Sequence, residues 1–212
     1  MAGIFITFEG IDGCGKSTQV RLFTDWLVKQ GKPVLVTREP GGTPLAERIR
    51  RVLLEPVEEE VYPLTEILLY AASRAQHVAG QIGPALAAGK IVICERFVDS
   101  TFAYQGYGLG YDLALIKELN HVATGGLVPD WTLLMDLPPE LAAARLHGRA
   151  GGEDRIEARG LAFQGRVRDG YLRLAADHPK RIHRIDLGDR GVEAIQCEIQ
   201  RAFQCRFPDL LG

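Results

Sequence analysis

The chain contains 212 residues, of which 46% are hydrophobic and 25% charged, and its formal net charge at pH 7 is -2. These values are typical of a globular protein with a core of ordinary size, so we expect a single domain over residues 1–212. Because the charge has no basic bias, a nucleic-acid polymer is not an expected partner.

Short β-branched runs alternate along the chain with amphipathic segments of helical length. We expect strands over residues 4–9, 33–37, 90–94, 131–136 and 182–186. Helical patterns cover residues 16–30, 44–54, 64–88, 112–123, 139–147, 158–177 and 191–205. Nearly continuous apolar strands that alternate with helices predict a doubly wound α/β fold, in which helices flank a five-stranded parallel sheet. In such folds, ligands bind at the carboxyl ends of the strands.

The first predicted strand runs directly into a glycine-rich loop that opens the first predicted helix. The loop has the pattern G-x-x-x-x-G-K-[ST], which predicts a site for the phosphates of ATP. Its glycines let backbone N–H groups close around phosphate oxygens, and the helix dipole favours the same negative charge. Lys16 would neutralise phosphate charge, and Ser17 would ligate Mg²⁺. The expected ATP-binding residues are Gly10, Ile11, Asp12, Gly13, Cys14, Gly15, Lys16, Ser17 and Thr18.

Charged pairs follow the second and third predicted strands. Arg38 and Glu39 follow the second strand, and Glu95 and Arg96 follow the third. Because the carboxyl ends of parallel strands meet at one edge of the sheet, both pairs should lie beside the phosphate-binding loop. An isolated pair of this kind is usually a surface ion pair, but two of them beside this loop favour the binding of a charged substrate.

A glycine-rich segment near residue 150 is the candidate for a small mobile lid, over about residues 145–157. It is flanked by Arg145, Arg149 and Arg155, which would bring positive charge to the phosphates. An ordinary solvated turn between two helices is the alternative interpretation.

The cysteines and histidines give no sign of a metal site. Four cysteines form no C-x-x-C pair and have no histidines at zinc-ligand spacing, so reduced thiols and a cytoplasmic location are expected. The sequence has no run of 18 apolar residues and no signal-peptide core, so neither a membrane span nor export is expected. Solvated or capping roles are expected for all five histidines, which are His77, His121, His147, His178 and His183.

Several ordered motifs resemble those of the thymidylate kinases, in the bacterial branch of the nucleoside monophosphate kinase-like P-loop enzymes. The likeness covers nearly the whole chain and rests on segments 8–10 (FEG), 38–43 (REPGGT), 69–74 (LYAASR), 95–97 (ERF), 104–106 (YQG) and 154–157 (DRIE). It implies transfer of the γ-phosphoryl group of ATP to dTMP, giving dTDP, with Mg²⁺ as cofactor. It also implies a homodimer. The large apolar face of the 64–88 helix fits a homodimer, although an ordinary buried helix would have the same pattern.

The resemblance also assigns residues to dTMP. It implies that Asp12 holds the sugar 3′-hydroxyl, while Arg38 and Arg96 hold the acceptor phosphate. Tyr70 would stack on thymine, and Tyr104 would sit where a ribose 2′-hydroxyl would clash. Two further side chains would hydrogen-bond the edge of the base, with a threonine nearby. The complete substrate-binding set is Asp12, Glu39, Tyr70, Arg74, Arg96, Thr101, Tyr104 and Gln105, in which Arg74 and Gln105 contact the base edge.

Two departures from the family pattern concern charge at the reacting phosphates. Glu95 stands where many relatives carry aspartate, and its longer carboxylate can still reach a water bound to Mg²⁺, so Ser17 and Glu95 are the expected metal residues. Gly13 stands where eukaryotic-type enzymes carry arginine, which implies that the lid supplies that charge, with Arg149 as the first candidate and Arg145 or Arg155 as the others. The expected catalytic residues are Lys16, Arg38, Glu95, Arg96 and Arg149.

Two other functions fit the phosphate-binding loop. A deoxynucleoside kinase would act on a neutral hydroxyl and would need a carboxylate base, for which Glu39 is available. An arginine next to Glu39 favours an anionic acceptor instead, because a neutral 5′-hydroxyl leaves it without a partner. A GTPase-like or ATP-dependent switch is disfavoured, because the sequence has no guanine-reading N/T-K-x-D motif.

Overall fold

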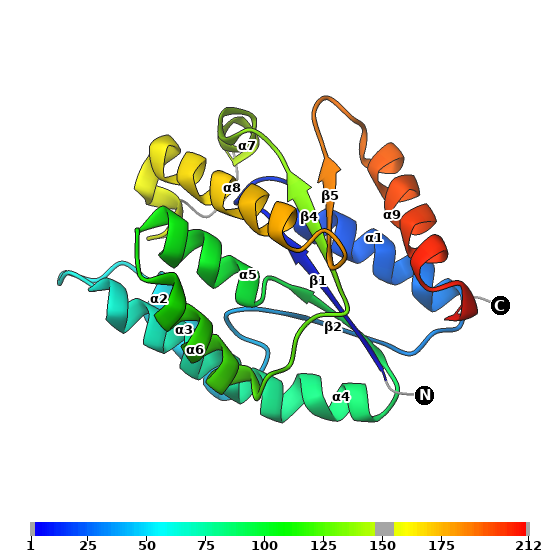
Figure 1. Cartoon of the computed structure of the whole chain (residues 1–212), viewed down its shortest axis with the longest axis horizontal. Helices are drawn as coiled ribbons and strands as arrows, with labels where there is room; N and C mark the ends of the chain where they lie inside the picture. Colours follow the sequence, from blue (N-terminus) through cyan, green and yellow to red (C-terminus); the bar gives the residue numbers. More distant parts are fainter. Residues whose placement is uncertain (1–2, 147–154, 211–212) are drawn as a thin grey trace.

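Five parallel strands form the centre of the computed structural model, which describes residues 3–146 and 155–210. The strand order is β2-β3-β1-β4-β5, so the chain crosses over on both sides of β1 (Figure 1). The predicted doubly wound parallel sheet is therefore confirmed. The strands are β1 (Ile4–Glu9), β2 (Val34–Arg38), β3 (Ile91–Glu95), β4 (Trp131–Asp136) and β5 (Ile182–Asp186).

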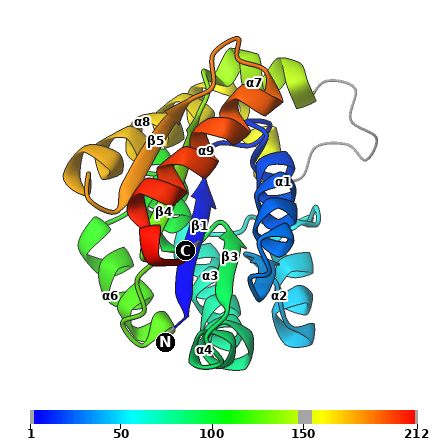
Figure 2. The same ribbon diagram turned by 90° about the vertical axis from the view of Figure 1, so that its right-hand side faces the viewer.

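Helices cover both faces of this sheet. In Figure 1, α1 and α9 lie on one side of the strands and α5 and α8 on the other, and Figure 2 looks onto the first of these layers, with α9 in front of the strands. The α-helices of the described residues are α1 (Lys16–Lys29), α2 (Pro44–Leu54), α3 (Pro63–His77), α4 (Gly83–Ala87), α5 (Val98–Thr101), α6 (Leu113–Thr124), α7 (Pro139–Leu146), α8 (Gly160–Asp177) and α9 (Val192–Arg206). Two π-helical segments, Val78–Ile82 and Phe102–Gly108, continue α3 and α5, and two short 3₁₀ turns lie at Glu157–Arg159 and Pro208–Leu210.

The burial of the strands explains their composition. Every residue of β4 is buried, and β1 is buried after its first residue, because helices cover these central strands on both faces. Between the sheet and the α1 and α9 layer, the ring of Phe23 packs 5.3 Å from that of Phe203, which lies 6.2 Å from Trp131. On the other face, Phe5 packs edge-on against Phe97 at 4.8 Å. These aromatic contacts fix both helical layers to the sheet.

Two features of the helices differ from the sequence-based expectation. The expected 64–88 helix is present, but the π-helical segment Val78–Ile82 interrupts it between α3 and α4. The helical stretch formed by α5 and Phe102–Gly108 was not expected, because its Ser, Thr and Gly residues are weak helix formers. Extensive packing against α8 stabilises this stretch in place of intrinsic propensity.

The expected lid, at about residues 145–157, falls mostly on residues 147–154, which lie outside the described part of the chain. Within the described residues, no helix has the length and apolar character needed to cross a bilayer.

Candidate active site

The glycine-rich loop lies between the carboxyl end of β1 and the first turn of α1. Three of its glycines have backbone φ angles that other residues rarely adopt, +139° at Gly10, +78° at Gly13 and +96° at Gly15. At Gly13 a side chain would also collide with the backbone of α7, since an added Cβ would lie 2.5 Å from the Ala142 carbonyl oxygen. No side chain caps the amino end of α1, so its first N–H groups point into the loop. The loop has the form of an anion-binding site made of backbone.

Lys16 lies folded along the inside of this loop. Its Nζ donates hydrogen bonds to the carbonyl oxygens of Gly10, at 3.0 Å, and Ile11, at 2.8 Å. Its side chain is only 4% exposed, so the ammonium group is already desolvated and positioned. Thr18 is on the exposed side of the first turn of α1.

The two predicted metal residues are adjacent. The Ser17 hydroxyl donates to Oε1 of Glu95 at 3.0 Å, which joins the start of α1 to the carboxyl end of β3. Both side chains offer oxygen, the ligand atom that Mg²⁺ prefers, and Mg²⁺ in kinases takes one or two protein ligands together with phosphates and water. In the described part of the chain no group of three His, Cys, Asp or Glu side chains is placed to hold a metal ion. The pair therefore fits a magnesium ion that is held largely by a bound nucleotide.

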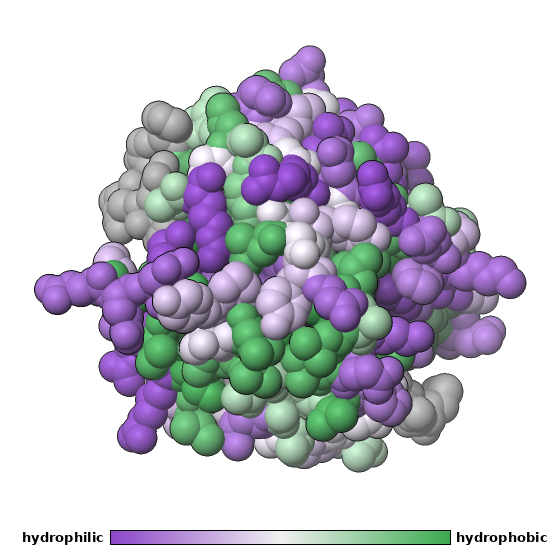
Figure 3. Space-filling model, turned by 60° about the vertical axis from the view of Figure 1, so that its left-hand side comes forward, coloured by the Kyte–Doolittle hydropathy of each residue, from purple (hydrophilic) through white to green (hydrophobic). Residues whose placement is uncertain are grey.

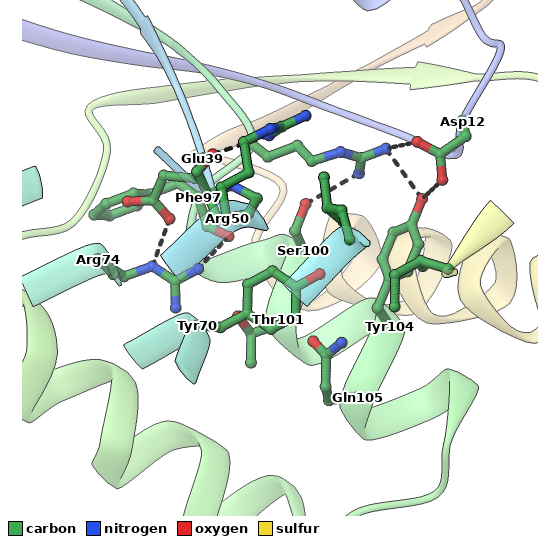
Figure 4. A pocket seen from close by; sticks show the side chains of 14 residues that line it. Asp12, Glu39, Arg50, Tyr70, Arg74, Phe97, Ser100, Thr101, Tyr104 and Gln105 are labelled. Atoms are coloured by element: carbon green, nitrogen blue, oxygen red, sulfur yellow. Dashed lines mark hydrogen bonds and ion pairs between the residues drawn. The ribbon is translucent and has the colours of Figure 1, made fainter. Parts of the chain in front are cut away.

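All eight predicted substrate-binding residues line one pocket beside this loop. Figure 4 shows their side chains converging from four parts of the chain, namely the glycine-rich loop, the segment after β2, α3 and the α5 region. The empty space among these side chains, part of it open to solvent, is about 540 Å³. The further lining residues, which the sequence analysis missed, are Pro40, Arg50, Leu54, Phe97, Ser100 and Ile156.

A network of charges links the pocket to the loop. Arg96 pairs with Asp12 at 2.6 Å and bonds the Gly10 carbonyl at 3.0 Å, and the Tyr104 hydroxyl donates to Asp12 at 2.7 Å. Burial raises the pKa of Asp12, but the charges of Arg96 and Lys16 outweigh it and hold that pKa at about 2. Arg96 has a φ angle of +69°, the one positive value among the described non-glycine residues, so its backbone is strained at this point.

A buried carboxylate, Glu9, is linked to Arg96 through the Ser100 and Tyr171 hydroxyls, both of which Arg96 also contacts. It accepts hydrogen bonds from the Phe97 N–H at 2.7 Å, the Ser100 hydroxyl at 2.6 Å and the Tyr171 hydroxyl at 2.9 Å. Burial, together with the nearby charge of Asp99, raises the pKa of Glu9 to about 7 in spite of these donors. Glu9 was not among the predicted site residues.

Arg74 and Glu39 form a buried ion pair on the wall of the pocket. Arg74 Nε donates to Glu39 Oε2 at 2.7 Å, and its two terminal nitrogens donate to Asn120 at 2.6 Å and to the Phe97 carbonyl at 3.1 Å. The second Glu39 oxygen lies 3.2 Å from Nδ1 of His77, which is completely buried. The expectation of a solvated or capping role for His77 is therefore wrong. Its ring instead joins Glu39 to the Thr37 hydroxyl at 2.7 Å.

Gln105 lies at the other end of the pocket and contacts a carboxylate that the sequence analysis did not single out. Its Nε2 donates to Oε1 of Glu66 at 2.9 Å. Arg155 and Arg159 also bind Glu66, at 2.8 and 2.7 Å. Arg155, one of the three lid candidates, is thus engaged with α3. A signal for Glu66 exists in the sequence, because this acidic residue stands one and two helical turns before Tyr70 and Arg74 on the same face of α3.

Of the other arginines predicted to act in catalysis, Arg38 does not line the pocket. Arg38 points to α2, where it pairs with Glu47 at 3.2 Å and stays about half exposed. The guanidinium of Arg50, from α2, lines the pocket instead and donates to the Pro40 carbonyl at 2.9 Å. Arg145 is exposed at the end of α7, and Arg149 lies outside the described residues.

The geometry defines a class of protein. A loop built for a nucleoside triphosphate and a pocket with a fixed guanidinium meet at Asp12 and Arg96, on the carboxyl edge of one parallel sheet. Such an arrangement belongs to P-loop kinases, which bring two substrates together and transfer a phosphoryl group between them.

Comparison with known proteins defines the family within this class. A family model described as thymidylate kinase matches residues 8–199. A thymidylate kinase from Geotalea uraniireducens is 50% identical over 212 residues, covering 98% of this chain and 99% of the relative. One from Exiguobacterium sp. is 53% identical over 199 residues, covering 94% and 93%. The crystal structure of a thymidylate kinase from Ehrlichia chaffeensis is similar with a TM-score of 0.77 and 37% identity, covering 96% of this chain and 99% of that one. The chain therefore belongs to the thymidylate kinase family.

Proposed function

We propose that this protein transfers the γ-phosphoryl group of ATP to the phosphate of dTMP, giving dTDP and ADP. Family membership supports this activity, and one structural observation carries it. Asp12 of the phosphate-binding loop lines the pocket, and Arg96, which also lines it, donates to the Gly10 carbonyl of the loop, so two nucleotides bound there would meet at their phosphates.

The chemistry asks the protein for positive charge rather than for a base. An oxygen of the acceptor phosphate attacks the γ-phosphorus, and the bond from that phosphorus to the β–γ bridging oxygen breaks, so ADP leaves. Two unit charges about 4 Å apart repel by roughly 4 kcal/mol at an effective dielectric of 20. Lys16 and Arg96 are held in place to cancel this repulsion, and positioned charge of this kind is the main contribution of such enzymes.

A magnesium ion would be held by Ser17 and Glu95 together with phosphate oxygens. When bound, it supplies charge that neutralises the β- and γ-phosphates. The hydrogen bond between these two side chains keeps both oxygens at the mouth of the loop.

Arg38 and Arg149 remain part of the proposal on the strength of the family motifs. Arg38 would leave its partner Glu47 and contact the acceptor phosphate. The Arg38–Glu47 pair is about half exposed, so breaking it leaves no buried charge. Arg149 would act on the transferred phosphoryl group, with Arg145 and Arg155 as the alternatives. Arg155 is the less suitable of these, because it already binds Glu66 and the Leu53 carbonyl.

The deoxynucleoside kinase alternative loses support at Glu39. A general base needs a carboxylate oxygen free to accept the proton of the substrate hydroxyl. One oxygen of Glu39 lies 2.7 Å from Arg74 and the other 3.2 Å from His77. This carboxylate therefore serves to position Arg74.

The direct test is a panel of acceptors. Purified protein with Mg-ATP is offered nucleoside monophosphates and nucleosides, and both ADP and the phosphorylated product are measured. We expect dTDP from dTMP and no product from thymidine. Consumption of thymidine without conversion of dTMP would refute the proposal.

We also propose a cytoplasmic homodimer. Figure 3 shows hydrophobic side chains gathered on the face over α2, α3 and α6. Exposed apolar residues contribute from each helix, and such contiguous faces usually mark protein interfaces. These residues are Leu45, Val52, Leu64, Leu68, Leu113, Leu115 and Val122. Two exposed free thiols, Cys197 and Cys205, suit a reducing compartment.

The dimer is tested by placing a charge in this face. Leu68→Glu introduces a carboxylate where the side chain is 48% exposed, and it should convert a dimer to a monomer in sedimentation velocity. Val28→Glu on α1 makes the same change at a 57% exposed site away from the face and should leave the mass unchanged. A monomeric wild-type protein would exclude the proposed dimer.

A further inference from the structure

Glu66 stands apart from the other charged residues near the pocket, because it does not line the pocket but holds a residue that does. It lies in the first turn of α3 and is completely buried. Arg159 donates to both of its carboxylate oxygens, at 3.2 and 2.7 Å, Arg155 lies 2.8 Å from Oε2, and Gln105 donates to Oε1 at 2.9 Å. Hydrogen bonds from Arg159 and Gln105, together with the ion pair to Arg155, thus surround this carboxylate.

The ionised state of Glu66 follows from these partners. Burial alone would raise its pKa, but Arg159, Gln105 and Arg155 outweigh burial and lower the pKa below the ordinary value. An ionised carboxylate can only accept hydrogen bonds. It therefore accepts the N–H of an amide, and an amide oxygen in the same place would be repelled.

This restriction fixes the orientation of the Gln105 side chain. Its NH₂ group must face Glu66, so its carbonyl oxygen faces the other way, and Gln105 is one of the residues that line the pocket. In Figure 4 this oxygen lies on the side of Thr101. The described residues supply no hydrogen-bond donor to it. The pocket thus presents an acceptor at Gln105. Arg74 also lines the pocket, and each of its two terminal nitrogens keeps a second N–H besides the one that it donates to Asn120 or Phe97.

The two pyrimidine types respond to this pattern in opposite ways. Thymine and uracil carry a donor at N3–H beside an acceptor at O4, which complements an acceptor beside a donor. Cytosine carries an acceptor at N3 beside a donor at its 4-amino group. In the same position, its acceptor would face the Gln105 oxygen and its donor would face the Arg74 N–H groups. A site whose buried polar groups are left unpaired rejects a ligand strongly.

We propose that Glu66 is a positioning residue that fixes the polarity of Gln105 and so makes the pocket select a pyrimidine bearing N3–H over cytosine. The inference rests on the proposed function, since it concerns the acceptor of that same reaction. Arg155 and Arg159 contribute to this selection because their positive charges keep Glu66 ionised.

The test replaces the carboxylate by an amide of the same shape. In Glu66→Gln the group facing Gln105 can either donate or accept, so the Gln105 amide is free to turn. We expect the ratio of kcat/KM for dTMP to that for dCMP to fall by about tenfold or more, as one hydrogen bond ceases to discriminate. The ratio of dTMP to dUMP should not change, because these two bases share N3–H and O4.

A matched control separates this effect from lost stability. Asp136 is another buried carboxylate that holds two arginines, Arg168 and Arg184, each at 2.7 Å, and it is not among the residues that line the pocket. Asp136→Asn should lower the thermal midpoint while leaving the dTMP to dCMP ratio unchanged. A change of that ratio in Asp136→Asn as large as in Glu66→Gln would overturn the inference.

A second variant keeps the proposal testable if Glu66→Gln does not fold. Gln105→Met removes the amide and leaves Glu66 with both arginines, and it should narrow the dTMP to dCMP ratio to a similar extent. In that background Glu66→Gln should have no further effect on the ratio. Two results would overturn the role of Glu66. One is an unchanged dTMP to dCMP ratio in Gln105→Met, and the other is a double variant in which Glu66→Gln lowers this ratio as much as it does in the wild-type background.

The outcomes also distinguish the inference from the function beneath it. If the wild-type protein makes no dTDP from dTMP, the proposed function fails. If the wild-type protein makes dTDP and a folded Glu66→Gln keeps the wild-type preference over dCMP, only the positioning role fails.

Discussion

The two nucleotide sites of this protein are built in different ways. The loop for the triphosphate is made of eight consecutive residues, 10–17, and its binding surface is backbone held by glycines with positive φ angles. The acceptor pocket is made of side chains from four separate parts of the chain. Its arginines are held by carboxylates, Arg74 by the buried Glu39 and Arg96 by the half-buried Asp12.

The difference matters for how each site responds to change. A backbone site depends on local conformation, so its remaining side chains are replaceable apart from the glycines, Lys16, Ser17 beside Glu95, and Asp12, which also lines the pocket. In the pocket, removal of one member of an ion pair leaves the other buried without compensation, which is strongly destabilising. Substitutions in the loop should therefore change the chemical step, whereas substitutions in the pocket should change folding, binding and selectivity together.

Lys16→Ala should have the largest effect on turnover, and it should separate the chemical step from dTMP binding most clearly. The ammonium group is fixed inside the loop by two carbonyl oxygens and contacts no residue that binds the base. We expect kcat to fall by roughly a thousandfold, because a positioned charge at the reacting phosphate is lost. The dissociation constant of dTMP, measured by calorimetry without ATP, should stay within a few fold. A comparable loss in both quantities would show that the two sites are not independent.

Glu9→Gln tests the buried carboxylate that accepts hydrogen bonds from Ser100 and Tyr171 beside the pocket. Folding raises the pKa of Glu9 from its ordinary value of 4.5 to about 7. Between pH 4.5 and pH 7, this carboxyl group is therefore protonated in the folded protein and ionised in the unfolded protein. The stability that it contributes is full below pH 4.5 and is lost as pH rises toward 7. Relative to Glu9→Gln, the wild-type protein should lose on the order of 3 kcal/mol of unfolding free energy across this window.

The measurement is urea denaturation of both proteins at several pH values from 4.5 to 8. Other groups that titrate in this range, such as the histidines, are common to both proteins and cancel in the difference. Parallel stability curves would mean that the three hydrogen bonds donated to Glu9 keep it ionised in spite of its burial.

The contrast between the sites also explains what the sequence could predict. All five strands were predicted within one residue at each end. The signal is clearest for β1, β3 and β4, because buried parallel strands read as nearly continuous apolar runs. The place of the glycine-rich loop between β1 and α1 was predicted, because its pattern has particular residues at fixed spacing, and its binding of ATP stays a prediction. Both signals are local in the sequence.

The pocket could be predicted only in part. Its eight expected residues do come together, but the family motifs rather than spacing pointed to them. The helical stretch that carries Thr101, Tyr104 and Gln105 was missed, because tertiary packing against α8 overrides its weak propensity. The burial of His77 and the pairing of Gln105 with Glu66 join residues some 40 positions apart, and no local pattern encodes such pairs.

Arg149→Ala tests a residue that the sequence alone places at the reacting phosphates. We expect kcat to fall by about a hundredfold while dTMP binding stays nearly constant, since a charge used only in the transition state does not affect the ground state. Arg145→Ala, a change of the same size at an exposed position on α7, is the matched comparison. A larger loss in Arg145→Ala would assign the role to that arginine instead.

Tyr104 offers the smallest effect and the sharpest test of selectivity in the pocket. Its ring packs under the Arg96 guanidinium at 4.9 Å, and its hydroxyl donates to Asp12. Tyr104→Ala opens space where a ribose 2′-hydroxyl would clash. We expect the ratio of kcat/KM for dTMP to that for its ribonucleotide analogue to fall by about tenfold, since a steric barrier of this size is worth 1–3 kcal/mol.

Tyr104→Phe separates the ring from its hydroxyl. It keeps the bulk that excludes the 2′-hydroxyl but removes the hydrogen bond to Asp12, so the sugar preference should remain while activity on both nucleotides declines together. The reverse result, with preference lost in Tyr104→Phe, would mean that the hydroxyl selects the sugar through Asp12. The pocket would then read the sugar, as it is proposed to read the base, through a carboxylate that fixes the polarity of a neighbouring group.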